Sequence, residues 1–142
     1  MQASVLAEAP LHFVHPLFRA AIYDELGRNE RALHHRRAAG VLAESGASGA
    51  AIAQHLLVSM PSNDRWVLDQ LQAAARQAAA SGAYESAAVY LRRAVAEMPS
   101  SLSAELLLEL GMAEVNAGQP DWDNHFRQAV ALAEDDVNPR LM

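Results

Sequence analysis

The chain has 142 residues, no cysteine, a formal net charge of −6 and 51% hydrophobic residues. The lack of cysteine excludes disulfide bonds, a thiolate nucleophile and a cysteine-ligated zinc site. More than half of the acidic residues lie from Glu97 onward, where Arg127 and Arg140 are the only arginines. We expect this acidic half to repel phosphate backbones, so direct nucleic-acid binding through it is not expected.

Composition also indicates the fold class. Alanine-rich segments dominate, and alternating runs of Val, Ile and Thr are nearly absent, which favours an all-α fold over a sheet. No uncharged run approaches the length of a membrane span, and residues 1–10 lack the basic start of a signal peptide. We therefore expect a cytoplasmic protein that makes no contact with a membrane.

The first predicted elements surround Pro16. Residues 11–14, a short run that is apolar except for His12, could form the last strand of a small hairpin. Pro16 suits the first turn of a helix, because its missing N–H would be unpaired there. This helix is predicted to end near Gly27. A second helix is predicted from a cap at Asn29 to Ser45-Gly46.

Two more helices follow in the next part of the chain. The third is predicted from about Gly49 to Ser59, and Pro61 ends it. Its apolar stripe consists of Ile52, Leu56 and Leu57. A fourth helix follows a cap at Asn63 or Asp64. Its stripe consists of Val67, Leu71, Ala74, Ala75 and Ala78.

The last three predicted helices have the clearest periodicity. After a turn at Gly82, the fifth has the i, i+3, i+4, i+7 stripe Tyr84, Ala87, Ala88, Leu91, Ala94, Val95 and Met98. Ser103 interrupts the start of the sixth, whose stripe is Leu106, Leu107, Leu110, Ala113 and Ala117. After Gly118 to Pro120, the seventh shows Trp122, Phe126, Ala129, Val130 and Ala133. The stripes contain no cluster of inward-facing polar residues, which an enzyme would need.

Short peptides recur along the chain at a nearly constant interval. Ser45-Gly46-Ala47 recurs 36 residues later as Ser81-Gly82-Ala83, and Ala117-Gly118 follows after another 36. Met60-Pro61-Ser62 recurs as Met98-Pro99-Ser100. A period in the mid-thirties is typical of stacked helix pairs, which bury their apolar faces against neighbours and leave a continuous surface for a partner.

The pattern of this repeat resembles the tetratricopeptide repeat. Leu107-x-x-Leu110-Gly111-x-Ala113, followed by Gly118, Phe126 and Ala129, matches its large, small and turn positions. A second match consists of Leu71, Ala74, Ala75, Ala78, Gly82, Ala87, Leu91, Ala94 and Pro99. The spacing differs from the usual period of about 34 residues. The resemblance implies helical-hairpin repeats arranged as an α-α superhelix.

The N-terminal third carries a narrower resemblance. Phe13-Val14-His15-Pro16-Leu17-Phe18-Arg19-Ala20-Ala21-Ile22-Tyr23 is followed by Arg31-Ala32-Leu33-His34, Arg37-Ala38-Ala39 and Ala53-Gln54-His55-Leu56-Leu57. This arrangement is similar to a junction in large, MalT-like bacterial regulators of the LuxR type, which are signal-transducing ATPases. In those proteins a nucleotide-binding domain precedes a winged-helix segment, a helical-repeat sensor region and a DNA-binding helix-turn-helix. The resemblance covers roughly residues 12–135.

This resemblance implies a domain organisation and a function. Residues 1–28 would be the end, a short remnant, of a winged-helix-like segment, and residues 29–142 a tetratricopeptide-like repeat domain. The chain would be a non-catalytic segment of a transcriptional regulator that binds a protein or small effector and relays this to a nucleotide switch. The sequence has no GxxxxGK[ST] phosphate loop, so ATP or ADP, like DNA, would bind other domains of the intact protein. The alternative is a stand-alone scaffold for protein–protein interaction.

His15 is the candidate cofactor-binding residue. The resemblance implies that, in the intact regulator, this histidine contacts the phosphates of ADP and stabilises a closed, inactive state. A protonatable imidazole at a helix start suits an anion contact. The alternative is that His15 caps or packs its own helix beside Pro16.

Other candidate sites have simpler structural readings. His34-His35-Arg36-Arg37 could contact an anion, but a solvated helix face with His34 partly packed is the competing interpretation. Trp66 and Trp122 could line a ligand groove or serve as core anchors at helix starts. His12 and His15 lack a carboxylate at a spacing that would complete a metal site. Because the ends of a short repeat stack are apolar, we also expect a homodimer.

Overall fold

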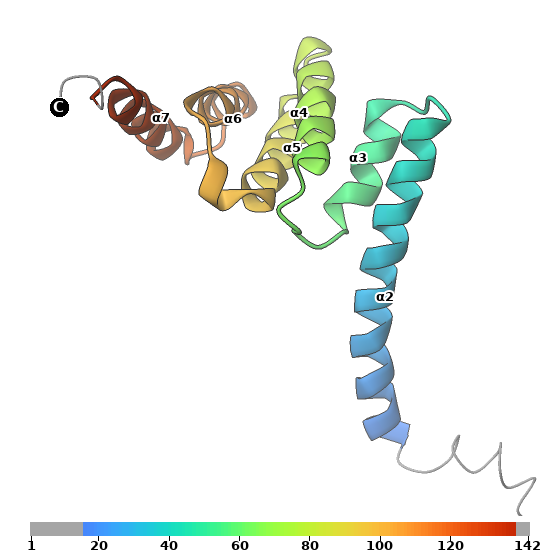
Figure 1. The fold of residues 1–142 in the computed structure, drawn as a ribbon. Coiled ribbons are helices and arrows are strands. Elements are labelled where there is room, and N and C mark those ends of the chain that lie inside the picture. The colour runs from blue at the N-terminus through green and yellow to red at the C-terminus, as the bar shows by residue number, and fades with distance from the viewer. Residues whose placement is uncertain (1–15, 139–142) are drawn as a thin grey trace, which may run out of the picture.

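The computed structural model describes the backbone of residues 16–138 and the side chains of residues 27–138 (Figure 1). This part of the chain is all-helical, as expected from the sequence, and contains six α-helices and no strand. The helices are α2 (Pro16–Glu44), α3 (Gly49–Leu57), α4 (Arg65–Ala80), α5 (Tyr84–Glu97), α6 (Ala104–Ala117) and α7 (Trp122–Val137), with a short 3₁₀ helix, η1 (Pro99–Ser101). Within the described residues, no helix has the length and apolar character needed to cross a membrane.

The predicted break near Gly27 is wrong, because α2 is one continuous helix of 29 residues. A glycine ends a helix when it adopts the left-handed conformation, and the described glycines with positive φ do not include Gly27. The Arg31 side chain instead donates to the Gly27 carbonyl, 3.1 Å away, four residues back along the helix. The helix spans the position of the predicted domain boundary between residues 28 and 29.

Three glycines turn the chain between paired helices, as the repeated peptides predict. Gly46, Gly82 and Gly118 have φ values of 77°, 84° and 70° and separate α2 from α3, α4 from α5, and α6 from α7. After each glycine, the next N–H donates to a carbonyl five residues back, at 2.9, 2.8 and 2.9 Å respectively. A hydrogen bond of this kind, closing the end of a helix, is part of the Schellman motif. The motif requires the left-handed conformation, which glycine adopts without strain.

Side-chain caps fix three helix starts. Ser48, Asp64 and Ser103 accept hydrogen bonds from N–H groups in the first turns of α3, α4 and α6. The cap of α4 is therefore Asp64 rather than Asn63. Ser103, which the sequence pattern presents as an interruption of a stripe, is the cap that starts α6.

The helices pack in chain order as a curved row, with α2 at one end and α7 at the other (Figure 1). The core lies between the pairs and is built mainly from alanine and leucine, so the helices approach closely. The predicted stripes of α4, α5 and α6 supply most of it. In α7, by contrast, Ala129 is the one buried residue, and Trp122 and Val130 are exposed. Of the stripe predicted for α7, only Ala129 is buried and Phe126 partly buried, and Trp122, Val130 and Ala133 are exposed.

Candidate functional site

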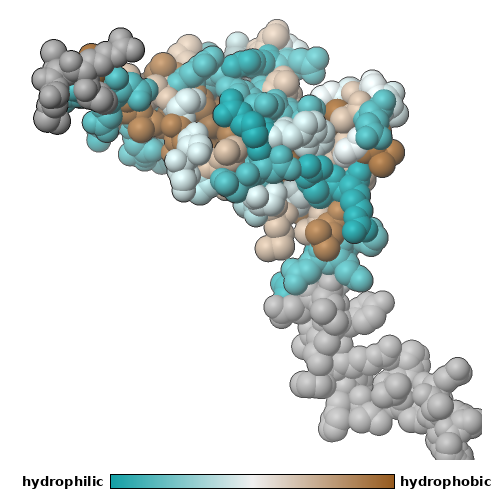
Figure 2. Space-filling view, viewed as in Figure 1, coloured by the Kyte–Doolittle hydropathy of each residue, from teal (hydrophilic) through white to brown (hydrophobic). Residues whose placement is uncertain are grey.

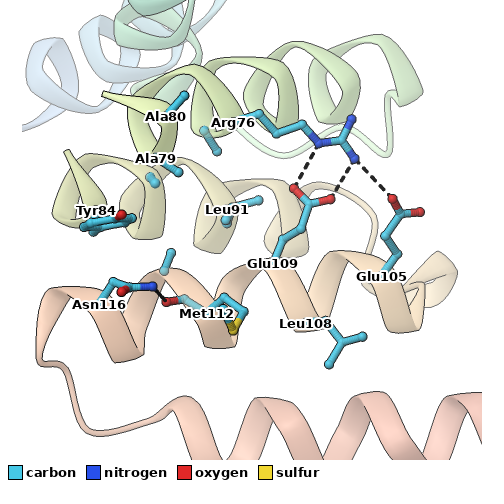
Figure 3. A pocket seen from close by; sticks show the side chains of 13 residues that line it. Arg76, Ala79, Ala80, Tyr84, Leu91, Glu105, Leu108, Glu109, Met112 and Asn116 are labelled. Carbon is cyan, nitrogen blue, oxygen red and sulfur yellow. Dashed lines mark hydrogen bonds and ion pairs between the residues drawn. The ribbon is translucent and has the colours of Figure 1, made fainter. Parts of the chain in front are cut away.

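A cavity of about 780 Å³ lies where α4, α5 and α6 meet (Figure 3). Small alanines of α4 and α5 leave room for it, Leu91 of α5 lines it, and Leu108 and Met112 of α6 form another wall. Both α6 side chains are about half exposed. We call this cavity the α4–α6 groove; its lining is Ala75, Arg76, Ala79, Ala80, Tyr84, Ala87, Leu91, Glu105, Leu108, Glu109, Met112, Ala113 and Asn116.

One end of the α4–α6 groove carries a charged cluster. The Arg76 guanidinium donates to both oxygens of Glu109, at 2.7 and 3.1 Å, and lies 3.3 Å from a Glu105 oxygen (Figure 3). Gln72 adds a hydrogen bond of 2.8 Å to Glu109. The Glu109 carboxylate raises the pKa of Arg76. This cluster connects α4 to α6 across the groove and gives an apolar ligand a polar end to orient against.

The other end of the groove is neutral and polar. Tyr84, the first residue of α5, and Asn116 of α6 lie there, away from Arg76 (Figure 3). The Asn116 amide donates 2.8 Å to the Met112 carbonyl of its own helix. The groove is therefore apolar along its length, with hydrogen-bonding groups at both ends. Such a lining fits a ligand by its shape and by apolar contact, with polar groups at each end to orient it.

A buried carboxylate holds the α3–α4 connection in place. Glu97, 1% exposed at the end of α5, accepts hydrogen bonds from the backbone N–H groups of Ser62 and Asp64, both at 3.0 Å, and from the Ser62 hydroxyl at 3.1 Å. Arg93, one turn earlier, donates to Glu97 at 2.7 Å and to the carbonyl and hydroxyl of Ser59, both at 3.1 Å. Burial raises the pKa of Glu97, but the hydrogen bonds from Arg93, Ser62 and Asp64 outweigh it and leave the pKa below its usual value.

A second carboxylate is enclosed between α5, α6 and α7. Glu114 of α6 is fully buried, and its two oxygens have different partners. Arg92 of α5 lies 3.0 Å from Oε1, and His125 Nδ1 of α7 lies 2.7 Å from Oε2. Arg92 also reaches Gln119 beyond the Gly118 turn. Glu114 therefore ties the last two helices to the rest of the row.

The absence of inward-facing polar groups, expected from the stripes, is thus wrong for Glu97 and Glu114. Each lies one or two positions from stripe residues, and nothing in its own helix distinguishes it from a solvated glutamate. Apart from Arg93, which lies four residues before Glu97, their partners lie 11 to 35 residues away, so the burial is a tertiary effect. The sequence does contain a weak signal of this burial. Each glutamate has an arginine that the predicted helices could bring close to it, Arg93 for Glu97 and Arg92 for Glu114. Both oxygens of each carboxylate have a hydrogen-bond partner within the protein.

The structure distributes the predicted His34–Arg37 cluster over two faces of α2. His34 is exposed, so the expectation that it is partly packed is wrong. The residue that packs is His35, whose Nδ1 lies 2.8 Å from Nδ1 of His55 in α3. In this pair one nitrogen donates and the other accepts, so the pair carries at most one proton between the two atoms. Arg36 points to α4, and Arg37 is exposed.

The two tryptophans lie at helix starts and outside the α4–α6 groove. Trp66 stacks under the Arg36 guanidinium, 4.4 Å from the ring centroid, and Arg36 also pairs with Asp64 at 2.7 Å. Trp122 makes an edge contact with Phe126, with ring centroids 5.8 Å apart. The anchor reading is supported for Trp66, which packs against the core. Trp122 remains partly exposed.

Several predicted site residues lie outside the described part of the chain. These are His15, the proposed phosphate contact of the intact protein, together with His12 and the strand predicted for residues 11–14. In the described residues, no group of three or more His, Asp or Glu side chains is placed to hold a metal ion. Comparison of the sequence with protein-family models, and of the chain with curated proteins and solved structures, finds no match.

Proposed function

We propose that this chain is a non-catalytic, effector-binding segment of a LuxR-type transcriptional regulator, built of tetratricopeptide-like helical hairpins. The observation that carries the proposal is the α4–α6 groove, an open apolar surface bounded by helices of successive hairpins. A protein segment or a small apolar molecule is the effector class that suits such a lining. Binding of the effector would change the distance between α4 and α6. This change in distance is the signal that would pass to the neighbouring helices.

The turns support the repeat part of the proposal. Gly46, Gly82 and Gly118 recur at 36-residue intervals and end the first helix of each pair in the same backbone conformation. Each pair then packs against the next through neighbouring helices. Stacked units of this kind transmit a change in one interface to the next, because each unit contacts only its neighbours.

The non-catalytic part rests on the state of the buried polar groups. Glu97 and Glu114 have the burial that an acid or base catalyst needs, but they lie outside the α4–α6 groove. Their oxygens are occupied by backbone N–H groups, arginine and histidine. The carboxylates that do line the groove, Glu105 and Glu109, are engaged by Arg76.

The link to a nucleotide switch comes from the resemblance of residues 13–57 to the LuxR-type junction. In the intact protein, ATP or ADP would be held by another domain, and His15 would contact its phosphates. DNA would be bound by a further domain. These contacts concern parts of the regulator other than the described helices.

A substitution in the groove tests the proposal in the source cells. Met112→Glu places a charge on the groove wall, and Val115→Glu places one on the same helix, at a similarly exposed position outside the groove. The transcripts that change on deletion of the gene should change with Met112→Glu and stay at wild-type levels with Val115→Glu. Wild-type transcripts in the Met112→Glu strain would exclude the groove as the effector site. Unchanged transcripts on deletion would exclude a regulator altogether.

The second candidate is a stand-alone scaffold that joins protein partners. The same groove and the same open helix faces favour it, because both functions need a binding surface and no chemistry. The scaffold predicts that deletion changes no transcript directly and that the native polypeptide is no larger than this chain.

A further inference from the structure

The last helix presents an apolar face that no described element covers. Val130 and Val137 of α7 are 55% and 65% exposed, and Ala133 lies between them on the same side of the helix. Hydrophobic surface is visible at the α6–α7 end of the row (Figure 2). Glu134, also exposed, lies beside these valines. The result is an acidic, apolar surface, which we call the α7 face (Val130, Ala133, Glu134 and Val137).

Helix α5 provides a comparison, because it is also the second helix of a pair. Val95 of α5 follows the buried Ala94, as Val130 of α7 follows the buried Ala129. Val95 is partly buried and packs against the core, whereas Val130 is exposed. The difference is that α6 lies against α5, while the described chain has no helix after α7. Among the described residues, no helix lies against the α7 face as α6 lies against α5.

The opposite end of the row offers a first helix with a free side. At the junction of α3 and α4, Ala74 and Gln77 of α4 lie within about 4 Å of the Gly49 position. The residues 36 positions earlier, in α2, are Ala38 and Val41. Val41 is 64% exposed. Ala38, Val41 and the neighbouring exposed Arg37 form what we call the α2 face.

The two faces are complementary in charge and in apolar pattern. Arg37 lies one turn from Val41, as Glu134 lies one turn from Val130 and Val137. Within the described residues neither charge has an ion-pair partner. The chain already uses a similar charge pair between consecutive hairpins, since Arg92 of α5 binds Glu114 of α6 at 3.0 Å. The 29-residue α2 is also long enough to span all of α7.

We propose that the α7 face of one copy binds the α2 face of a second copy, so that copies associate head to tail. Val41 of the second copy packs against Val130 and Val137, and its Arg37 lies beside Glu134. The contact continues the row, because the second helix of one hairpin meets the first helix of another, as α3 meets α4. Such a contact joins two different surfaces, so it produces open chains or rings rather than the homodimer expected from the sequence.

Sedimentation velocity of the 142-residue chain and its variants tests this contact. Wild-type chain should form a concentration-dependent series of dimers, trimers and larger species, which shortens at high salt because the charge pair is screened. Val41→Glu and Val130→Glu each place a carboxylate at an exposed position, so folding should be retained, and each should weaken association by about tenfold or more. Val89→Glu, at an exposed position of α5 away from both faces, is the matched control and should associate as wild type.

Mixing the two variants gives the decisive result. Val41→Glu retains its α7 face and Val130→Glu retains its α2 face, so the mixture should form a one-to-one dimer that does not grow. A mixture that stays monomeric overturns the proposal. So does a Val41→Glu chain that associates like wild type, because this would show a symmetric contact between two α7 faces. A wild-type chain that is monomeric throughout the micromolar to millimolar range also overturns it.

Discussion

Glu97 shows how one side chain positions an entire connection. Residues 58–64 join α3 to α4 without regular structure, and Asn63 within them has a positive φ of 58°. The Glu97 carboxylate accepts the N–H groups of Ser62 and Asp64 on either side of this strained residue. Asp64 is therefore held where it can cap α4 and pair with Arg36.

Replacing Glu97 should therefore be costly. In Glu97→Ala, two backbone N–H groups and the nearly buried Arg93 lose their acceptor, so we expect a loss of about 3 kcal/mol in the free energy of unfolding. Urea unfolding followed by circular dichroism measures it. Glu105→Ala, which removes an exposed carboxylate of the groove cluster, should cost less than about 1 kcal/mol. Equal losses in the two variants would contradict the role given to Glu97.

The same carboxylate makes stability depend on pH. Burial raises the pKa of Glu97, but the hydrogen bonds that it accepts lower the pKa by more. The folded-state pKa is therefore below the usual value. The pKa of Asp64 is also lowered, chiefly by the hydrogen bond from Arg36. A carboxyl with a depressed folded pKa stabilises the fold above its unfolded pKa of about 4, and this stabilisation is lost as the pH falls through the folded pKa.

We therefore expect the advantage of wild type over Glu97→Gln to be smaller at about pH 3 than near neutral pH. Urea unfolding of both chains at the two pH values measures the difference. If the stability advantage of wild type instead grew as the pH fell, the pKa of Glu97 in the folded state would be raised rather than lowered, which would contradict this account.

Gly111 is a packing glycine rather than a turn glycine. It lies inside α6, and a Cβ there would be 2.5 Å from Cε1 of Phe126 in α7. The gain in helix propensity from alanine, about 1 kcal/mol, is smaller than the cost of displacing the ring. We expect Gly111→Ala to lower the unfolding free energy by about 1 kcal/mol. Phe126→Leu in the Gly111→Ala background should recover part of this loss, and an additive result would show that the ring is not the obstacle.

At the scale of elements, the glycines divide into two classes that substitution should separate. Gly82 turns α4 into α5 with a φ of 84°, so Gly82→Ala should cost about 1 kcal/mol. Gly40 lies inside α2, and a Cβ there would meet a single atom at 3.9 Å. Gly40→Ala should therefore stabilise the chain by up to about 1 kcal/mol. Thermal unfolding of both variants tests the opposite signs, and destabilisation by both would show that α2 is not a regular helix at this point.

The elements that the sequence predicts well are those set by local chemistry. The turns at Gly46, Gly82 and Gly118 depend on a glycine in the left-handed conformation, and the cap at Asp64 depends on a carboxylate next to the first N–H groups. The helix break predicted at Gly27 is wrong, because a glycine permits the left-handed conformation but does not require it. The surrounding helix-forming residues decide the outcome.

The site was less accessible to sequence reasoning. The α4–α6 groove brings together residues that lie about 30 positions apart, and its volume depends on which alanines face each other across the helices. The stripes of α5 and α6 contain several of these residues but cannot show which of them stay uncovered. The burial of Glu97 and Glu114 was missed because it depends on groups distant in the sequence: the α3–α4 connection for Glu97, and Arg92 of α5 and His125 of α7 for Glu114.

At the scale of the molecule, the chain is a row of hairpins with three surfaces for partners. The α4–α6 groove lies within the row, and the α2 and α7 faces lie at its two ends (Figure 1). Between these surfaces, the buried carboxylates of Glu97 and Glu114 link neighbouring elements of the row by hydrogen bonds. A ligand in the groove would therefore alter the separation of α4 and α6, with consequences for the ends. Under the proposed function, this change in separation would be the signal that the segment passes on.

The size of the native polypeptide tests the central claim most directly. An antibody against this 15.3 kDa chain, applied to an immunoblot of the source cells, reads it in one experiment. A segment of a LuxR-type regulator predicts a band far above this mass, because the nucleotide-binding and DNA-binding domains belong to the same polypeptide. A single band at the mass of the chain itself would contradict the regulator and leave the stand-alone scaffold.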